Sequence, residues 1–425
     1  MKNKLLQLLE AQVRRYFKKT PPKLVVITGS VGKTGTKAAI ATVLGQRFRV
    51  RAHQGNHNTH FSVPLALMDV PYPPNPRSAW QWLKVLLLMR LKTARPKDVE
   101  VIIQELGTDT PGDIPRFMSY LKPDIAVITA VSPEHMEFFK DLDTVAREEL
   151  SPAAASGLAL INRDDIAEEF ARYAATSSIS TYGLSGVAEY NFLIEDRLAE
   201  GGFKGKLTGP ELGSVSLSLN AVGEHNLKAL VAAAAVGAKL GLSGRQIVSG
   251  LESVKPVPGR MQLLRGLNNS VLIDDSYNSS PLAAAAALKT LYDFEAPQRI
   301  AILGSMNELG GMSPQLHESL GELCDPRLLA WVVTVGHDAA QYLAPAAAAR
   351  GCQVRSFASP YEAGAFVHKV LEPHAVVLAK GSQNGVFTEE ALKMLLHSTA
   401  DEARLVRQSP QWLLKKRAQF FKDAV

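Results

Sequence analysis

A short glycine-rich segment that ends in lysine and threonine, residues 28–34, has the residue types of a phosphate-binding loop. A β-branched run precedes it and an Ala-rich stretch follows it, which predicts a strand, a turn and the start of a helix. Backbone N–H groups and the helix N-terminus would then face phosphate oxygens, the lysine would add a positive charge, and the threonine hydroxyl could bind Mg²⁺. The candidate nucleotide-binding residues here are Gly29, Ser30, Gly32, Lys33 and Thr34.

This loop is a compressed form of the usual nucleotide motif. Ile27 stands where the full Walker pattern has its first glycine, so only the second half of that pattern is present. The alternative interpretation is a chance glycine turn before a helix. The predicted strand and helix on either side favour phosphate binding.

An acid and an imidazole follow two further predicted strands. Glu105 ends the strand expected at 99–106, and a short loop after the strand expected at 125–130 leads to His135. In a parallel sheet both side chains would lie at the carboxyl edge, together with the phosphate loop. Glu105 is then a natural Mg²⁺ ligand, and His135 could be a second metal ligand. The alternatives are an exposed strand-end acid and an exposed loop histidine.

The last third of the chain carries a second set of polar residues at strand ends. Asp274 and Asp275 end a strand, and the turn that follows, 276–281, opens a helix. Paired acids suit ribose hydroxyls, and Tyr277 or Asn278 suits a base. A cation and a flexible turn follow another predicted strand, at Lys380, Gly381 and Ser382.

Strand-like and helix-like runs alternate through most of the chain, which predicts an α/β fold with doubly wound, mostly parallel sheets. Residues 177–219 differ, because glycine turns separate alternating segments that indicate a small antiparallel subsheet. A helix is expected at 144–155 and a linker at 257–259. We therefore expect an amphipathic helix in 1–22, a central phosphate-loop domain in 23–256 and a smaller Rossmann-like domain with a basic tail in 257–425.

The composition is that of an ordinary globular protein. The chain has 425 residues, of which 46% are apolar and 21% charged, and a net charge of +6. Two cysteines without metal-ligand spacing favour buried thiols in a reducing cytoplasm. No signal peptide or spanning helix is indicated. Nucleic-acid binding is disfavoured, because aromatic residues do not alternate with the basic ones on one face.

Three segments combine apolar and basic residues: 1–20, 80–91 and 412–422. For the first two, packing as helices against the protein is favoured over contact with a membrane or a lipid substrate. For the tail, capping of the last domain and contact with anionic lipid are equally supported.

Taken together, the motifs resemble those of the Mur ligase family, and most closely its members that add D-alanyl-D-alanine to a peptidoglycan precursor. The likeness extends over 23–396. It rests on these segments in this order: Thr28-Gly29-Ser30-x-Gly32-Lys33-Thr34, Gly55-Asn56-x-Asn58, Glu105-Leu106-Gly107, His135, Asn162-x-Asp164-Asp165, Gly223-x-His225-Asn226, Pro258-Gly259-Arg260-Met261, Asp274-Asp275-Ser276-Tyr277-Asn278, Gly304-x-Met306-x-Glu308-Leu309-Gly310 and Lys380-Gly381-Ser382.

The resemblance implies an ATP- and Mg²⁺-dependent ligase. A substrate carboxylate would attack the γ-phosphate, and an amine would then displace phosphate from the acyl phosphate to leave an amide. Thr34 and Glu105 would hold one Mg²⁺ and His135 another, beside the catalytic Lys33. Further nucleotide contacts would come from Asn226, Arg260, Asp275, Tyr277 and Asn278, and substrate contacts from Asn56, Asn58, Lys380 and Ser382.

Two departures from the family pattern stand out. Only one helix precedes the phosphate loop, where the family has a domain that binds uridine diphosphate. Glu149 occupies the position of a carbamylated lysine, so a native carboxylate would help order the second Mg²⁺; a surface acid is the alternative. Gln383 and Ser305 replace the family's usual Arg and Asp near the last substrate.

Two rival functions stay open. One is a ligase of this family for an acceptor without a nucleotide, of the poly-γ-glutamate, cyanophycin or folate polyglutamate type. The other is a non-catalytic ATP-binding scaffold, against which the intact Lys33, Thr34, Glu105 and His135 argue. We expect a cytoplasmic enzyme, with peripheral membrane contact through the basic ends as an alternative, and the sequence leaves its oligomeric state open.

Overall fold

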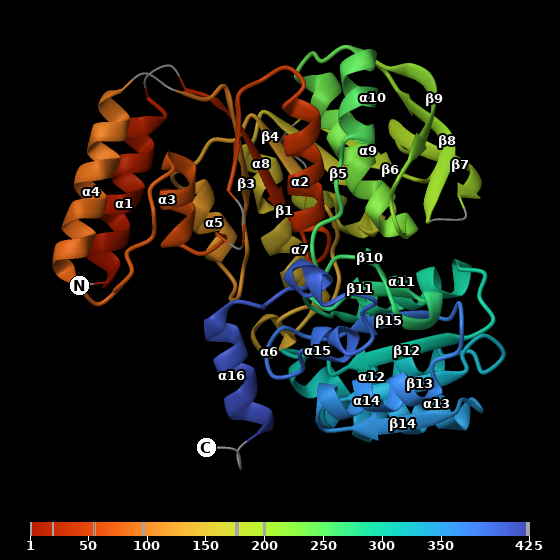
Figure 1. Cartoon of the computed structure of the whole chain (residues 1–425). Helices are drawn as coiled ribbons and strands as arrows, with labels where there is room; N and C mark the ends of the chain where they lie inside the picture. Colours follow the sequence, from red (N-terminus) through yellow and green to blue (C-terminus); the bar gives the residue numbers. More distant parts are fainter. Residues whose placement is uncertain are drawn as a thin grey trace.

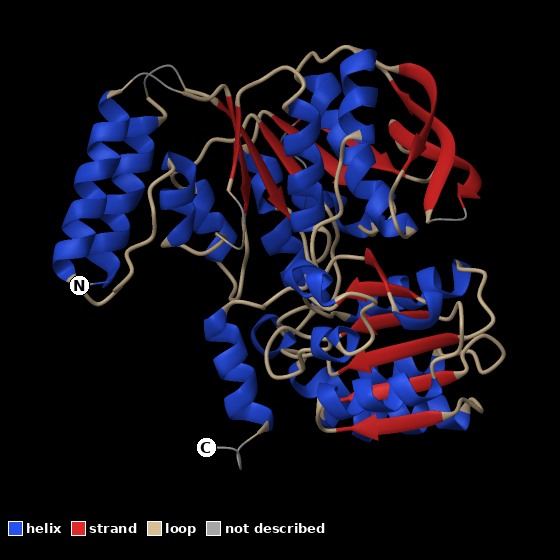
Figure 2. Ribbon diagram, viewed as in Figure 1, coloured by secondary structure: helices blue, strands red, loops and turns tan. Residues whose placement is uncertain are grey.

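The protein consists of two α/β units, each built on its own sheet (Figure 1, Figure 2). The computed structural model describes residues 2–18, 21–53, 55, 57–95, 98–174, 178–198 and 201–421. The first unit fills the upper half of Figure 1 and the second unit the lower half, with helices on both faces of each sheet. The expected α/β fold is confirmed.

The first sheet has nine strands in the order β2-β3-β1-β4-β5-β6-β7-β8-β9. Its strands are β1 (Lys23–Thr28), β2 (Val50–Ala52), β3 (Val101–Glu105), β4 (Ile125–Ile128), β5 (Leu158–Asn162), β6 (Ser178–Gly183), β7 (Tyr190–Leu198), β8 (Gly202–Gly209) and β9 (Gly213–Leu219). The strands from β2 to β7 pair in parallel, and β7, β8 and β9 pair antiparallel. The antiparallel subsheet is confirmed for these three strands. The prediction of antiparallel pairing was wrong for β6. This strand pairs in parallel with β5 and so extends the main sheet.

The second sheet has six strands in the order β10-β11-β15-β12-β13-β14. They are β10 (Gln262–Arg265), β11 (Val271–Asp275), β12 (Arg299–Gly304), β13 (Trp331–Val335), β14 (Val354–Phe357) and β15 (Val376–Lys380). All pairs are parallel except β10 with β11. The carboxyl ends of β11 and β15 are neighbours, which brings Asp275 opposite Lys380.

Helices connect the strands and cover the sheets. The α-helices are α1 (Lys2–Tyr16), α2 (Lys33–Leu44), α3 (Ser62–Met68), α4 (Ala79–Ala94), α5 (Asp113–Met118), α6 (Met136–Phe139), α7 (Leu142–Glu149), α8 (Ser151–Ala155), α9 (Glu224–Lys239), α10 (Gly244–Glu252), α11 (Pro281–Asp293), α12 (Ser313–Glu322), α13 (Ala344–Ala349), α14 (Pro360–Val370), α15 (Glu389–Lys393) and α16 (Pro410–Phe420). Shorter turns are η1 (Glu168–Ala174), η2 (Leu267–Asn269), η3 (Gly310–Met312), η4 (Ala339–Leu343) and η5 (Thr399–Arg404).

The helix expected at 144–155 is two helices, α7 and α8, that meet at Leu150. Pro152 lacks a backbone N–H and favours the first turn of a helix, so a new helix begins there. This break ends α7 directly after Glu149, whose side chain and carbonyl both face the phosphate loop.

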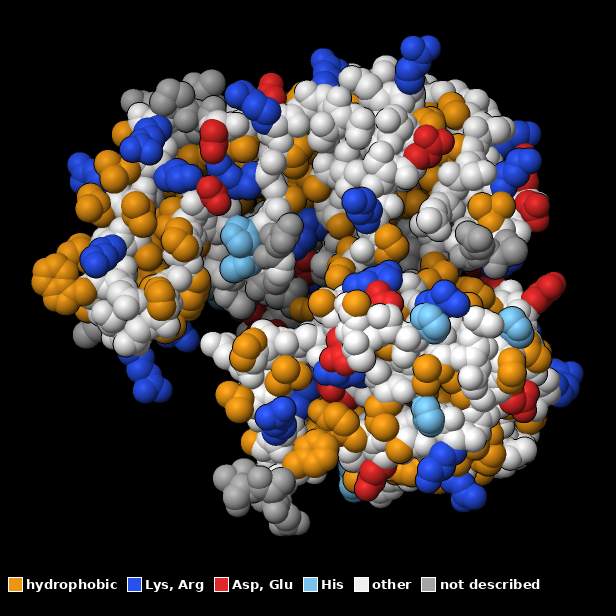
Figure 3. Space-filling model, viewed as in Figure 1, with side chains coloured by type: hydrophobic (Ala, Val, Ile, Leu, Met, Phe, Trp, Pro, Cys, Tyr) orange, Lys and Arg blue, Asp and Glu red, His pale blue; other side chains and the backbone are white. Residues whose placement is uncertain are grey.

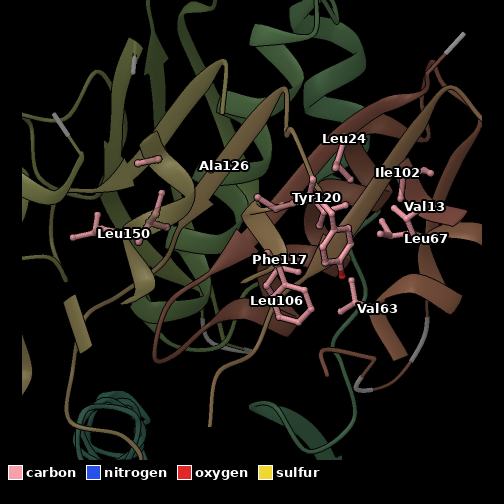
Figure 4. Packing of buried hydrophobic residues seen from close by; sticks show 14 of the residues in the cluster. Val13, Leu24, Val63, Leu67, Ile102, Leu106, Phe117, Tyr120, Ala126 and Leu150 are labelled. Atoms are coloured by element: carbon pink, nitrogen blue, oxygen red, sulfur yellow. The ribbon is translucent and has the colours of Figure 1, made fainter. Parts of the chain in front are cut away.

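The first unit's core lies partly between the sheet and the helices α1, α3, α4 and α5 (Figure 4). Val13 of α1, Leu24 of β1 and Phe117 of α5 are almost fully buried in it. Burying a side chain of this size stabilises a protein by about 1.5–3 kcal/mol. The expected packing of the first helix against the protein is confirmed.

The tail helix α16 caps the second unit. Phe420 and Phe421 contact Tyr361, and Trp412 contacts Phe387. Lys416 is completely buried and pairs with carboxylates of α15. Capping, one of the two interpretations of the tail, is therefore what the structure shows for the described residues.

Both cysteines, Cys324 and Cys352, are buried and free. Burial raises the pKa of Cys324 to about 12. Within the described residues, no helix combines the length and the apolar character needed to cross a bilayer.

Candidate active site

The segment between β1 and α2 forms a tight loop that leads into the N-terminus of α2. Gly29 has φ +122°, and a Cβ there would lie 2.2 Å from Thr129 Oγ1, so a side chain does not fit. Gly32 also has positive φ and precedes α2 without a side-chain cap. The Ser30 backbone N–H donates to Ala130 O at 3.0 Å, which fixes the loop against β4. The helix N-terminus is thus free to bind an anion.

Lys33 folds back over this loop, where its ammonium donates to the carbonyl of Gly29. Its Nζ lies 3.9 Å from Glu134 Oε2. Burial lowers the pKa of Lys33, but the carboxylates of Glu134, Glu149 and Glu105 outweigh burial and raise it above 10.5. Lys33 is therefore a charged group held where phosphate oxygens would approach the loop.

Thr34 and Glu105 meet at the carboxyl edge of the first sheet. The Thr34 hydroxyl lies 3.2 Å from Glu105 Oε2, and Lys37 Nζ lies 3.1 Å from the same oxygen. Glu105 is opposite Ile27 in the register of β1 and β3, so it lies at the carboxyl edge of the sheet, where its strand-end position had placed it. A hydroxyl beside a carboxylate is a suitable start for a Mg²⁺ site, which phosphate oxygens and water would complete.

Glu149 reaches the same loop from the other side. It is fully buried, and its Oε2 accepts a hydrogen bond of 2.6 Å from the Gly29 N–H. Burial raises the pKa of Glu149 well above 4.5; Lys33 opposes this shift and the carboxyl of Glu134 adds to it. The surface-acid alternative is wrong.

Glu134 and Glu149 fit a divalent cation. Each has a buried Oε1 that receives no hydrogen bond from a donor among the described residues. Ionised, the two carboxyls repel each other, and a cation between them would remove that cost. No three carboxylate, imidazole or thiol groups of the described chain are close enough together to hold a metal by themselves. Mg²⁺ here would therefore depend on phosphate and water ligands as well.

His135 lies at the junction of the two units. Its Nδ1 is 3.1 Å from Glu308 Oε2 of the second unit, and its Nε2 is 3.9 Å from Asp109 Oδ1. The hydrogen bond with Glu308 is the main cause that raises the pKa of His135. In this conformation the ring is paired with an acid, so metal binding would require His135 to release Glu308.

The second unit contributes a buried ion pair and an aromatic stack. Lys380 Nζ lies 2.7 Å from Asp275 Oδ2 and donates to Asn278 O at 2.8 Å. Burial lowers the pKa of Lys380, and Asp275 partly offsets that effect. The Arg260 guanidinium lies 4.3 Å from the centroid of the Tyr277 ring. These contacts position the turn after β11 over the phosphate loop.

Two adjoining hollows collect these residues. One, of about 230 Å³, is lined by the phosphate loop, Glu105, His135, Asn58 and Asn278. The other, of about 120 Å³, is lined by Asn226, Asp275 and Lys380, and Arg260 borders both. A phosphate chain in the first hollow and a nucleoside in the second would suit their linings.

The residues expected to bind substrate are placed differently from one another. Asn58 lines the larger hollow, whereas Asn56 lies outside the described residues. Lys380 is only 2% exposed and is committed to Asp275. Ser382 is also buried, and its Oγ accepts a hydrogen bond of 2.9 Å from the Asn307 N–H. In this conformation Lys380 and Ser382 therefore bind to neighbouring residues of the protein, while Gln383 lines the larger hollow.

Family models match the two units in turn. The Mur ligase middle domain matches residues 27–237, and the Mur ligase, glutamate ligase domain matches residues 259–383. The chain belongs to the Mur ligase family. The residues that line the two hollows lie within these two matched segments.

Two relatives of this Mur ligase share one name. The UDP-N-acetylmuramoyl-tripeptide--D-alanyl-D-alanine ligase of Bacillus subtilis is 26% identical over 337 residues, 78% of this chain and 66% of that one. The Escherichia coli enzyme of the same name is 28% identical over 341 residues, 77% and 67% of the two chains. This Mur ligase thus spans about two thirds of the length of these relatives.

Solved structures agree with the fold. MurF from Acinetobacter baumannii superposes with a TM-score of 0.75 at 26% identity, covering 94% of this chain and 79% of that one. MurF ligase from Thermotoga maritima in complex with ADP gives a TM-score of 0.76 at 23% identity, covering 92% and 83%. The second likeness concerns the fold alone.

Two contributors to the site, Glu134 and Arg407, were not predicted from the sequence. Glu134 precedes His135 directly, and that adjacency of an acid and an imidazole was an available signal. Arg407 donates to the carbonyls of Ser276 and Tyr277 at 2.7 and 2.8 Å. No signal in the sequence indicated this role, because Arg407 is about 130 positions from the turn that it contacts.

Proposed function

We propose that this Mur ligase joins a peptide carboxylate to an amine at the expense of ATP, and that its amine is D-alanyl-D-alanine or a similar dipeptide. The observation that carries the proposal is the convergence of Lys33, Glu105 and Glu149 at one sheet edge, which the turn of the second unit that contains Tyr277 adjoins. The names of the relatives support this choice of amine. The carboxylate would belong to a peptidoglycan precursor.

The phosphate loop would hold the ATP phosphates for attack. Backbone N–H groups around Gly32 and the N-terminus of α2 favour the negative charge, and Lys33 would leave the Gly29 carbonyl to contact the transferring phosphate. The substrate carboxylate oxygen bonds to the γ-phosphorus as the bond from phosphorus to the ADP oxygen breaks. The amine then bonds to the acyl carbon and phosphate departs.

Two sets of residues would hold Mg²⁺. Thr34 and Glu105 form one, and the buried carboxylates of Glu149 and Glu134 form the other, which His135 could join only after releasing Glu308. Bound Mg²⁺ supplies positive charge that stabilises the transferring phosphate. Glu149 already supplies a fixed carboxylate, so no carbamylation is needed at that position.

The second unit would bind the nucleoside and exclude water. Asn226, Arg260, Asp275, Tyr277 and Asn278 surround or adjoin the smaller hollow. An acyl phosphate hydrolyses in water, so contact between the units protects it until the amine arrives. The pair formed by His135 and Glu308 joins the two units on this side.

Product analysis tests the proposal. The protein is incubated with Mg²⁺, ATP, UDP-N-acetylmuramoyl tripeptide and D-alanyl-D-alanine, and the products are identified by mass spectrometry. We expect a new amide and ADP, and neither with Lys33→Ala or Glu105→Ala. The exposed Lys122→Ala is the matched control and should keep full activity.

Other outcomes reassign the function. ADP and amide formed only with acceptors that carry no nucleotide would identify a ligase of the poly-γ-glutamate or folate polyglutamate type. ATP binding without amide formation from any carboxylate and amine would identify a scaffold. We place the enzyme in the cytoplasm, because its cysteines are free thiols and ATP is its proposed co-substrate.

A further inference from the structure

Helix α4 is apolar on both of its faces. Trp82, Val85 and Met89 point into the core of the first unit. On the opposite face Trp80 is 75% exposed, Leu83 57% and Leu87 58%. A helix of a soluble protein normally has one apolar face only. The outer face of α4 therefore lacks a covering partner among the described residues.

The outer apolar residues form one broad stripe that Lys84 interrupts. At 100° per residue, Trp80, Leu87 and Leu91 lie in line, with Leu83 and Leu88 on either side. Leu8 of α1, the helix that packs beside α4, is exposed as well. Figure 3 shows hydrophobic side chains gathered with Lys and Arg over this left edge of the molecule, where Figure 1 places α1 and α4.

The charged residues of α4 are all basic. Exposed Lys84 lies within the stripe, between Leu91 and Leu88, and exposed Arg90 borders it beside Leu83. Lys92 pairs with Asp69 at 3.0 Å. Exposed basic residues also cover α1: Lys2, Lys4, Arg14 and Arg15. The single acid of these two helices is Glu10, which is buried and pairs with Arg116 at 2.9 Å. An apolar stripe with cationic borders matches the interface of an anionic membrane.

A groove opens beside the stripe between α1 and the start of α4. It has a volume of about 630 Å³ and is lined by Leu5, Phe61, Tyr72, Trp82 and Leu86, with Lys2 and Arg77 among the other lining residues. Apolar walls with cations are suited to acyl chains and anionic headgroups.

We propose that the outer face of α1 and α4 docks this enzyme onto a membrane surface that contains anionic phospholipid. Helix α4 would lie in the plane of the interface, with Trp80 and the leucines among the upper acyl chains and Lys84 and Arg90 at the headgroups. A second copy of the chain fits less well, because a two-fold contact through this face would bring the same cations together.

The basic tail is a weaker candidate for the same contact. Its aromatic residues pack against Tyr361 and Phe387, and Lys416 is buried. The docking face also lies apart from α2, which starts at the phosphate loop in the middle of the first unit (Figure 1). Docking would leave the active site open to substrates.

Vesicle co-sedimentation of the full chain tests the proposal. We expect binding to vesicles of phosphatidylcholine mixed with phosphatidylglycerol, and little binding to phosphatidylcholine alone. The variant Leu83→Ser/Leu87→Ser/Leu91→Ser should bind these vesicles at least about tenfold more weakly than the unmodified protein. The matched control Val187→Ser/Leu193→Ser/Leu414→Ser removes three exposed apolar side chains elsewhere and should bind like the unmodified protein. Unchanged ATP binding would show that each variant is folded.

Charge and fluorescence give independent readouts. Lys84→Glu/Arg90→Glu should weaken binding by about tenfold at low salt, and the difference should shrink at high salt. Lys122→Glu/Arg245→Glu makes the same change in net charge on other surfaces and should have little effect. Anionic vesicles should shift Trp emission to the blue, except in Trp80→Phe.

Three results would overturn the proposal. They are no binding of the unmodified protein to anionic vesicles, equal loss of binding in the control variants, and self-association that the triple leucine variant abolishes while vesicles have no effect. The last would make the face a contact between two copies.

Discussion

The buried carboxylate of Glu149 accepts a 2.6 Å hydrogen bond from the backbone N–H of Gly29, so α7 holds the first turn of the phosphate loop. Glu149→Gln keeps an acceptor for this bond and removes the negative charge. We expect kcat/KM for ATP to fall about 100-fold and the Mg²⁺ requirement to rise, because the site loses a carboxylate that would hold Mg²⁺ beside the transferring phosphate. Initial rates against Mg²⁺ concentration measure this. An unchanged Mg²⁺ dependence would contradict the role of Glu149.

The same substitution has a pH signature in stability. Because burial raises the pKa of Glu149, the folded protein binds a proton there more tightly than the unfolded chain. The stabilising contribution is full below pH about 4.5 and is lost as the pH rises through the raised pKa. Glu149→Gln does not titrate, so its Tm should fall less than that of the unmodified protein as the pH rises. Scanning calorimetry without nucleotide compares the two.

The pair of His135 and Glu308 should respond to pH as a contact between the units. Glu308 raises the pKa of His135 above 6.5, and His135 lowers the pKa of Glu308 below 4.5. The ion pair is therefore present between these two limits and is lost as His135 deprotonates at higher pH. In Glu308→Gln the pKa of His135 should return towards 6.5. NMR titration of the His135 ring, without Mg²⁺, detects the shift, and an unchanged pKa would refute the contact.

Lys416 tests the role of the tail helix. It is fully buried, with Nζ 2.8 Å from Glu389 Oε1 and 2.5 Å from Glu390 Oε1. Lys416→Met leaves two buried carboxylates with one partner fewer, and we expect a loss of about 3–5 kcal/mol in the free energy of unfolding. Urea unfolding measures it. The exposed neighbour provides the control, since Lys415→Met should change stability by less than about 1 kcal/mol.

Arg407 should couple that cluster to nucleotide binding. It forms two hydrogen bonds with Glu389, of 2.8 and 2.6 Å, and donates to the carbonyls of Ser276 and Tyr277. Arg407→Met should raise the Kd for ATP about tenfold or more by freeing the turn after β11. Isothermal titration with ATP provides the measurement. Equal affinity in a folded variant would show that the turn is held by other contacts.

The sequence by itself determined the local parts of this protein. Gly29 and Gly32 must bend the chain, a β-branched run must form β1, and a strand that ends at Glu105 must deliver that acid to the sheet edge, because each depends on neighbouring residues alone. These expectations are confirmed. The parallel pairing of β6 was missed, since alternation of residues does not specify which strand lies alongside.

Only the tertiary structure decided which distant residues meet. The contact of Glu149 with Gly29 spans 120 positions, that of His135 with Glu308 joins two units, and Lys416 pairs with acids of another helix. Local propensity carries no information about such contacts, because packing of whole sheets and helices creates them. The exposure of one apolar face of α4 was also decided by the tertiary structure, since a helix with apolar residues on two faces does not reveal which face the core will cover.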